Sequence, residues 1–157
     1  MILDNGDRTI YETGATRDIQ LGKGRCDLMP LSVIGDRLDT PVLEYIEKYI
    51  FNGDYRLLWD AIDFVIEEEG EDIVTAILDV SIHFEQGAFK YGERNWEKGI
   101  PLHSYIDSGL RHYLKYLRGD TDENHKRAFI WNILCAIHTQ IYIPDMVDLP
   151  FKEPFKE

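Results

Sequence analysis

One stretch of the sequence places acidic, basic and histidine side chains at helical spacing. His103, Asp107 and Arg111 follow one another at intervals of four residues, and His112 stands beside Arg111. Residues four apart share one face of a helix, so a carboxylate and a guanidinium converge there. These groups could hold a metal ion and a phosphate. The structural alternative is a common ion pair between Asp107 and Arg111 on an exposed helix.

A second stretch continues the pattern on the expected next helix. Asp122 and His125 are three residues apart, and Asn132 lies seven residues further on. This spacing again stacks polar side chains on one face, beginning at a helix N-terminus whose free N–H groups favour phosphate. Asp122 could instead be an N-terminal capping acid. His112 and His125 could be general acids or bases, or buried hydrogen-bonding side chains.

Hydrolysis of a triphosphate requires carboxylates for a divalent cation and cations for the phosphates. The carboxylates on offer are Glu85, Asp107 and Asp122. The phosphate-binding candidates are Lys90, Arg111, Lys23 and Arg25. The last two belong to a Gly-Lys-Gly-Arg turn, where glycine lets the backbone approach a phosphate. A solvated Glu85 and a plain surface turn at 22–25 are the structural alternatives.

The elements that must position these groups are helices. Apolar residues recur at helical spacing in five segments, which start or end at Thr, Pro, Asp or Gly. The expected helices are 41–52, 54–70, 71–91, 101–119 and one capped by Thr121 that runs through Ile141. In the helix 71–91, Ile73, Ile77, Val80, Phe84 and Ala88 form one apolar stripe.

These patterns predict an all-α fold, a compact helical bundle of about five helices with an ordered N-terminal arm. We expect a single domain over 1–157. Its parts are the arm 1–38, which contains the Gly-Lys-Gly-Arg turn, an acidic helical insertion 39–80, the helices that bear the polar motifs over 81–143, and an extended tail 144–157.

Composition excludes several classes of protein. The formal net charge of −12 argues against duplex nucleic acid as a partner, although the segment 39–80 alone has 12 acids against two bases. No apolar stretch is long enough to span a membrane, and Met1–Arg8 lacks the features of a signal peptide, so we expect a cytoplasmic protein. Cys26 and Cys135 lie far apart, which predicts free thiols rather than a disulfide framework or a zinc site.

Two known signatures of nucleotide hydrolases do not fit. The MazG type carries ExxE and then ExxD, and Glu44/Glu47 and Glu69/Asp72 offer this spacing here. The second pair straddles Gly70, where a helix is expected to end, so its two acids would not share a face. The HD type needs a His-Asp dipeptide, and none of the five histidines is followed by aspartate.

The chain nevertheless resembles a known family. The segments GATRDIQLGKGRCDLMP, FEQGAFKYGERNWEKG, IDSGLRHYLKYLRGDTDENH and AFIWN are similar, in this order, to the dATP/dGTP diphosphohydrolases of phages and prophages. The resemblance covers roughly 14–38 and 81–139, with the acidic segment between them. It implies a phage- or prophage-encoded enzyme of a bacterial host cell, which hydrolyses a purine deoxynucleoside triphosphate to monophosphate and pyrophosphate, in a helical fold related to MazG-type enzymes.

Position by position, the resemblance marks the residues that would line the site. These are Lys90, Tyr91, Asn95, Trp96, Arg111, His112, Asp122 and His125. We expect Asp122, His125 and His112 to be catalytic, and Asn132 to join the substrate-binding residues. Trp96 and Trp131 could also be packing residues rather than platforms for a base.

The leading hypothesis is an Mg²⁺-dependent nucleotide pyrophosphohydrolase, with Mn²⁺ as the alternative cation and a purine nucleotide as the partner. A protein that binds and sequesters a nucleotide without hydrolysis is the second reading. A structural protein whose acidic segment meets a basic partner is the third. A homo-oligomer is compatible with the several apolar helix faces, and the sequence leaves the oligomeric state open.

Overall fold

A computed structural model describes residues 8–151 of the chain. It confirms the all-α fold: helices dominate, and the described residues form a single two-stranded sheet. The helices are α1 (Leu31–Leu38), α2 (Val42–Asn52), α3 (Arg56–Glu68), α4 (Ile73–Tyr91), α5 (Leu102–Arg118) and α6 (His125–Tyr142). The strands are β1 (Arg8–Ile10) and β2 (Thr16–Asp18), and three short 3-10 helices are η1 (Cys26–Leu28), η2 (Asn95–Glu97) and η3 (Pro144–Met146).

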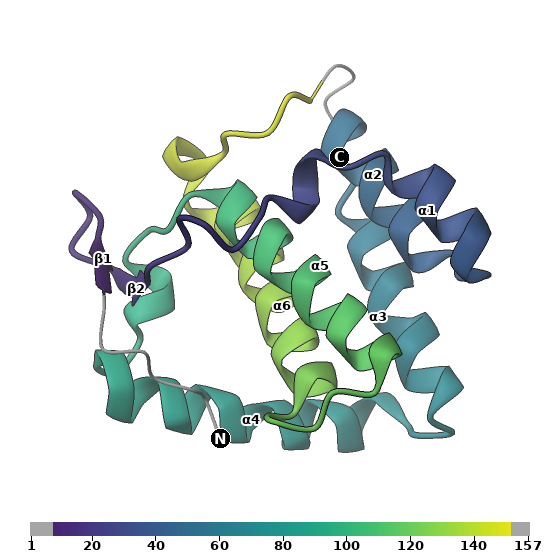
Figure 1. The fold of residues 1–157 in the computed structure, drawn as a ribbon. Helices are drawn as coiled ribbons and strands as arrows, with labels where there is room; N and C mark the ends of the chain where they lie inside the picture. The colour runs from purple at the N-terminus through teal and green to yellow at the C-terminus, as the bar shows by residue number, and fades with distance from the viewer. Residues whose placement is uncertain (1–7, 152–157) are drawn as a thin grey trace.

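Helices α5 and α6 form a hairpin at the centre of the molecule (Figure 1). Tyr105 and Leu110 of α5 and Phe129 and Ile133 of α6 are fully buried. Helix α4 crosses below the hairpin, and α1, α2 and α3 lie on the side opposite the small sheet (Figure 1). The central hairpin therefore carries both the core and the two stretches of polar residues.

Glycine and capping residues set the ends of these helices. Gly53 and Gly119 end α2 and α5 in the left-handed conformation, with φ of 72° and 85°, which glycine adopts without steric cost. Asn124 caps α6 by accepting a hydrogen bond from the N–H of Arg127. The expected cap at Thr121 is therefore wrong, because Asn124 lies at the position from which a side chain reaches the first free N–H groups.

The N-terminal arm is more regular than expected. β1 and β2 pair antiparallel, with Arg8 opposite Asp18, and the expected arm 1–38 also contains the helix α1. Helix α1 begins where the N–H of Leu31 donates to Glu47 Oε2 at 2.7 Å. It packs so closely on α2 that a Cβ on Gly35 would lie 3.3 Å from Leu43 Cβ. A tertiary contact thus stabilises a helix only two turns long.

The expected apolar stripe of α4 is only partly correct. Val80 is buried and Phe84 packs against the core, but Ile73 and Ile77 are 43% and 39% exposed. The buried face contains Ala76 and His83 instead, because α4 contacts the rest of the protein mainly through α6. Within residues 8–151, none of the helices combines the length and apolar composition needed to cross a membrane.

The acidic segment 39–80 contributes to the core. Its helices α2 and α3 bury Leu43, Ile46 and Ile62 completely, while its many acids lie mostly on the surface. Beyond α6 the chain forms η3 and then packs Phe151 against Tyr49, with ring centroids 5.6 Å apart. The expectation of an extended tail over 144–157 is thus modified by η3. Residues 152–157 lie outside the described residues, and so do residues 1–7 of the segment Met1–Arg8, for which no signal peptide was expected.

The closest packing of the central hairpin gives a testable prediction. A Cβ on Gly109 of α5 would lie 3.1 Å from Ile133 Cδ1, so Gly109→Val should lower the free energy of unfolding by about 1–3 kcal/mol through overpacking. Gly87→Val on α4 is the matched control, because no atom lies within 4 Å of its Cβ position. Urea denaturation measures both variants, and equal stabilities would contradict the close approach of α5 and α6.

Candidate functional site

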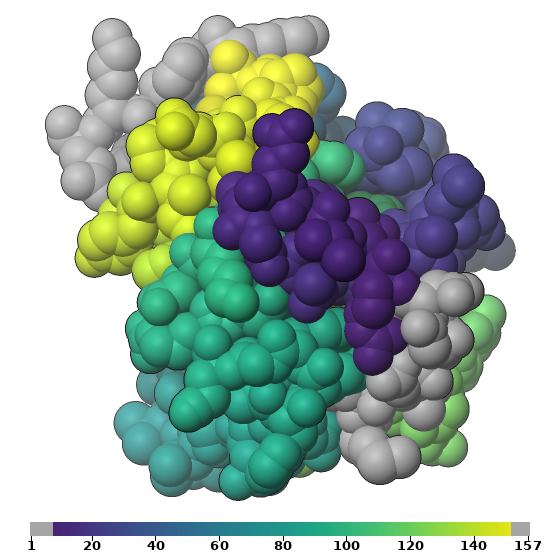
Figure 2. Space-filling view, turned by 90° about the vertical axis from the view of Figure 1, so that its left-hand side faces the viewer, coloured from purple at the N-terminus to yellow at the C-terminus, as the bar shows by residue number. Residues whose placement is uncertain are grey.

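The two stretches of polar residues and the N-terminal arm enclose a cavity of about 710 Å³. We call it the central cavity. Its walls come from β2 and the segment after it, from α4, α5 and α6, and from the loop between α5 and α6. Figure 2 shows the N-terminal segment, in purple, lying across the molecule beside the teal and yellow segments. A cavity of this size can hold a nucleotide-sized ligand.

Cationic side chains outnumber carboxylates around the central cavity. The cations are Arg17, Lys23, Arg111, Lys115 and Arg118, and the carboxylates are Asp18 and Glu123. The cavity therefore differs in sign from the chain as a whole, whose net charge is −12. Such a local excess of positive charge attracts an anionic ligand.

Three buried nitrogen atoms beside the cavity have no hydrogen-bond partner within the described residues. They are Arg17 Nη1, Arg111 Nε and Trp131 Nε1, and all three residues line the cavity. Each of these atoms can only donate. Because buried donors are nearly always satisfied, a ligand or water molecule with acceptor oxygens would complete the site.

Arg17 of the arm contacts the cavity wall formed by α6. Its Nη2 donates to Asn132 Oδ1 at 2.9 Å, and its guanidinium lies 5.2 Å from the ring centroid of Tyr105. Asn132 is itself fixed, because its Nδ2 donates to the carbonyl of Ala128. The arm therefore brings a positioned cation to the aromatic side of the cavity.

The pair expected on α5 anchors the arm. Both oxygens of Asp107 accept hydrogen bonds from Arg111 Nη2, at 2.9 and 2.8 Å, and Oδ1 also accepts from the N–H of Cys26 at 2.6 Å. Arg111 Nη2 donates as well to the carbonyl of Gly24 at 2.7 Å. The side chain of Asp107 is only 3% exposed. The Asp107–Arg111 pair is therefore buried, and it is not the exposed helix ion pair that was the structural alternative for these two residues.

Three residues of the segment 90–96 hold β2 in place. Lys90 Nζ and the Tyr91 hydroxyl donate to the two oxygens of Asp18, at 2.8 and 2.9 Å. Asn95 exchanges two hydrogen bonds of 2.8 Å with the backbone of Thr16. Tyr91 and Asn95 also line the central cavity, so they both position the arm and form part of the wall.

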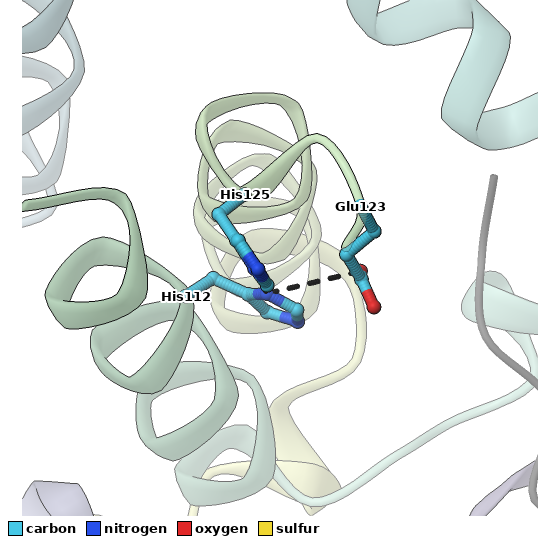
Figure 3. A group of neighbouring side chains, drawn as sticks. All are labelled: His112, Glu123 and His125. Atoms are coloured by element: carbon cyan, nitrogen blue, oxygen red, sulfur yellow. Dashed lines mark hydrogen bonds and ion pairs between the residues drawn. The ribbon is translucent and has the colours of Figure 1, made fainter. Parts of the chain in front are cut away.

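A histidine cluster, made of His112, Glu123, His125 and Asp122, lies where α5 meets the start of α6. His112 Nδ1 and His125 Nδ1 are 2.9 Å apart, and Asp122 Oδ1 lies 2.6 Å from His125 Nε2. Glu123 Oε1 is 3.9 Å from His112 Nδ1. Figure 3 shows His112, Glu123 and His125 pointing toward one another. His112 and Glu123 line the cavity, while His125 is buried behind them.

The surroundings of the cluster shift the pKa values of its side chains. Burial lowers the pKa of His112 to about 3, and the neighbouring His125 adds to the shift. Burial also raises the pKa of Glu123. The hydrogen bond from His125 lowers the pKa of Asp122. At neutral pH the His112 ring is therefore neutral and has a free lone pair.

The structure brings together only some of the residues expected from the sequence. Lys23, Tyr91, Asn95, Arg111, His112 and Asn132 line the central cavity. Arg25 instead pairs with Asp27 and faces a second hollow, and Trp96 packs against Phe84 and His138. Glu85 is exposed on α4. Within residues 8–151, Glu85, Asp107 and Asp122 do not form one group of metal-ligand atoms.

Several residues of the cavity were not among those expected. They are Arg17, His83, Lys115, Arg118 and Glu123. Lys115 and Arg118 continue the spacing of Arg111 along α5, so helical periodicity could have found them. Arg17 and His83 come from distant segments, and no sequence spacing connects them to the cavity.

Removing the anchor of the arm should destabilise the protein. Asp107→Ala leaves Arg111 buried without its counter-ion, so we expect a loss of about 3 kcal/mol in the free energy of unfolding. Glu44→Ala, which breaks the exposed pair with Lys48, should change it by less than about 1 kcal/mol. Denaturation in the presence of EDTA measures both. A loss that appears only when metal is present would instead make Asp107 a metal ligand.

The buried His83 should make stability depend on pH. Burial lowers its folded-state pKa to about 3 from the ordinary histidine value of about 6.5, so between these values the unfolded state binds a proton that the folded state does not. Stability should therefore fall as the pH falls below about 6.5, by up to about 1.4 kcal/mol per pH unit for this group.

Urea denaturation of wild type and His83→Gln between pH 5 and 6 measures this contribution as a difference in slope. His103→Gln is the control and should keep the wild-type slope. A hydrogen bond with Asp148 raises the pKa of His103, so this group stays mostly protonated in both states over that range. Identical slopes for wild type and His83→Gln would show that His83 binds a proton in the folded state as readily as in the unfolded state, and would contradict the lowered pKa.

Comparison with known protein families identifies a match. The family model described as dATP/dGTP diphosphohydrolase, N-terminal, matches residues 56–148, which is more than half of the 157 residues. The matched region begins inside the acidic segment 39–80, runs from the start of α3 through η3, and includes the histidine cluster. No curated protein and no solved structure matches the chain.

Proposed function

The chain belongs to the dATP/dGTP diphosphohydrolase family through the N-terminal model of that family, and on this premise we propose that it hydrolyses a purine deoxynucleoside triphosphate in the central cavity. The products would be the monophosphate and pyrophosphate. The observation that supports this most directly is the group of five cations around the cavity in a chain of net charge −12.

The phosphates would lie against the α5 wall of the cavity. Arg111, Lys115 and Arg118 follow one another along α5 and line this wall, and Lys23 faces them from the arm. Arg111 is paired with Asp107 and Arg118 with Asp120, whereas Lys115 forms no ion pair or hydrogen bond with residues 8–151, so its charge is available for a ligand. A triphosphate concentrates negative charge, and such cations stabilise it in the ground state and during transfer.

The purine would lie toward α6, where the wall is aromatic. Trp131 and His83 line this side, with ring centroids 5.0 Å apart, and Arg17 lies against Trp131 and Tyr105. The unpartnered donors Arg17 Nη1 and Trp131 Nε1 could donate to acceptor atoms of the base or sugar. Flat rings and directed donors are the usual means of recognising a base.

The histidine cluster would activate the attacking water at the wall where His112 and Glu123 face the cavity. Water attacks the α-phosphorus, and the bond from this phosphorus to the bridging oxygen breaks. Pyrophosphate leaves with that electron pair, and the proton of the water passes to the carboxylate of Glu123, whose pKa is raised by burial. Asp122 and His125 act through His112, so they are positioning residues in this scheme.

A divalent cation would add charge neutralisation and lower the pKa of a bound water. The expected ligands Glu85, Asp107 and Asp122 do not converge in the described structure, and Asp107 is occupied by Arg111 and Cys26. We therefore do not assign the cation to these three carboxylates. Within residues 8–151, donor atoms of His112, Glu123 and His125 do converge.

Incubation of the purified chain with a panel of dNTPs and NTPs, with and without divalent cations, tests the proposal. We expect monophosphate and pyrophosphate from dATP or dGTP, and loss of both products in Asp122→Ala. Lys115→Met should raise KM about 10-fold or more, because a charge-assisted contact is lost. Lys48→Met, a change at an exposed ion pair, is the matched control and should keep the wild-type KM.

Other outcomes would replace the proposal. Nucleotide that stays intact but remains bound after desalting would support the sequestering protein. Neither hydrolysis nor retention of any nucleotide in the panel would leave a structural role, in which the acidic surface meets a basic partner.

A further inference from the structure

We infer that His112, His125 and Glu123 bind a divalent transition-metal cation of the zinc type rather than Mg²⁺. One donor atom from each residue lies within 4.8 Å of the other two, and the three side chains point toward one another (Figure 3). The residues come from α5, from the start of α6 and from the loop between them. The fold of the hairpin therefore assembles the site.

The distances are close to those of a bound site. Nitrogen ligands lie about 2.1 Å from zinc, so two of them are separated by about 3.0 Å at a right angle and about 3.4 Å at a tetrahedral angle. The two Nδ1 atoms are 2.9 Å apart. Glu123 Oε1 lies 3.9 Å from His112 Nδ1. A small rotation of these side chains would place all three donors around one ion.

Asp122 sets the protonation that metal binding requires. Its carboxylate oxygen lies 2.6 Å from His125 Nε2, so the ring donates its proton there and keeps a lone pair on Nδ1, the atom that faces His112. A carboxylate on the outer nitrogen is the usual partner of a metal-binding histidine, because it orients the ring and increases its basicity.

The donor set decides the class of cation. Two imidazole nitrogens and one carboxylate suit zinc and its neighbours in the first transition row, whereas Mg²⁺ prefers oxygen ligands and retains several waters. Three protein ligands also leave a coordination position open, as in catalytic zinc sites. His112 and Glu123 line the central cavity, so the open position would face the cavity and its cations.

A second group of possible ligands shares His125. It consists of Asp120, Asp122 and His125, and it is less suited to an ion. Asp120 is already paired with Arg118, and the side chain of Asp122 is 51% exposed. The side chains of His112 and Glu123 are only 21% and 12% exposed. We therefore assign the cation to the inner group.

Metal titration of the full chain after EDTA treatment tests the inference without nucleotide, so its outcome is independent of the proposed hydrolysis. We expect about one equivalent of Co²⁺ to bind with visible absorption bands, and Zn²⁺ to displace it. Glu123→Gln and His112→Gln should each weaken binding at least about 10-fold. Asp120→Asn should bind like wild type, and millimolar Mg²⁺ should not compete.

Two results would overturn the assignment. Loss of binding in Asp120→Asn with retention in Glu123→Gln would move the ion to the outer group. Absence of Co²⁺ and Zn²⁺ binding to a wild-type chain that is helical by circular dichroism would leave only a hydrogen bond between His112 and His125. Circular dichroism of each variant separates a lost ligand from a lost fold, and Mg²⁺-supported hydrolysis without zinc binding would retain the proposed function while rejecting this inference.

Discussion

The buried carboxylate of Asp107 joins the N-terminal arm to the central helix hairpin. It accepts from Arg111 on its own helix and from the N–H of Cys26 in the arm, while Arg111 reaches the carbonyl of Gly24. A buried ion pair of this kind contributes modest net stability, because the two charges lose their hydration, but breaking it leaves a charge without a partner. The position of the arm, and with it one wall of the central cavity, depends on this contact.

A second attachment completes the wall. Asp18 accepts hydrogen bonds from Lys90 and Tyr91 at the end of α4, and Asn95 forms hydrogen bonds with the backbone of Thr16. Between the two attachments the arm carries Arg17 and Lys23 to the cavity. The chemically unusual segments around 14–30, 90–96 and 107–112 are thus linked by hydrogen bonds. The first of them, in the arm, binds to both of the others.

Acidic and basic side chains gather in different parts of the molecule. The acids of 39–80 lie mostly on the surface, on α3 and in the loops beside the helices, while apolar residues of α2, α3 and α4 fill the core. The cations gather instead on α5 and the arm, around the cavity. A chain of net charge −12 can therefore present a locally positive cavity, since the field near a ligand is set by the closest charges and more distant ones are screened.

Sequence patterns predicted the helical class and five of the six helices of the described residues, because 3.6-residue periodicity and helix-ending glycines are local properties. They also pointed to both stretches that meet at the central cavity. They did not reveal α1 or the β1–β2 pair, whose short segments are stabilised by distant partners such as Glu47 and Asn95.

Which polar groups act together depends on how the helices and the arm pack. Asp107 and Lys90 are used to hold the arm, and Glu85 stays on the surface, whereas His112, Glu123 and His125 converge. Spacing along one helix shows which residues share a face. It cannot show what faces them, because that depends on the path of the arm and on how α5 packs against α6.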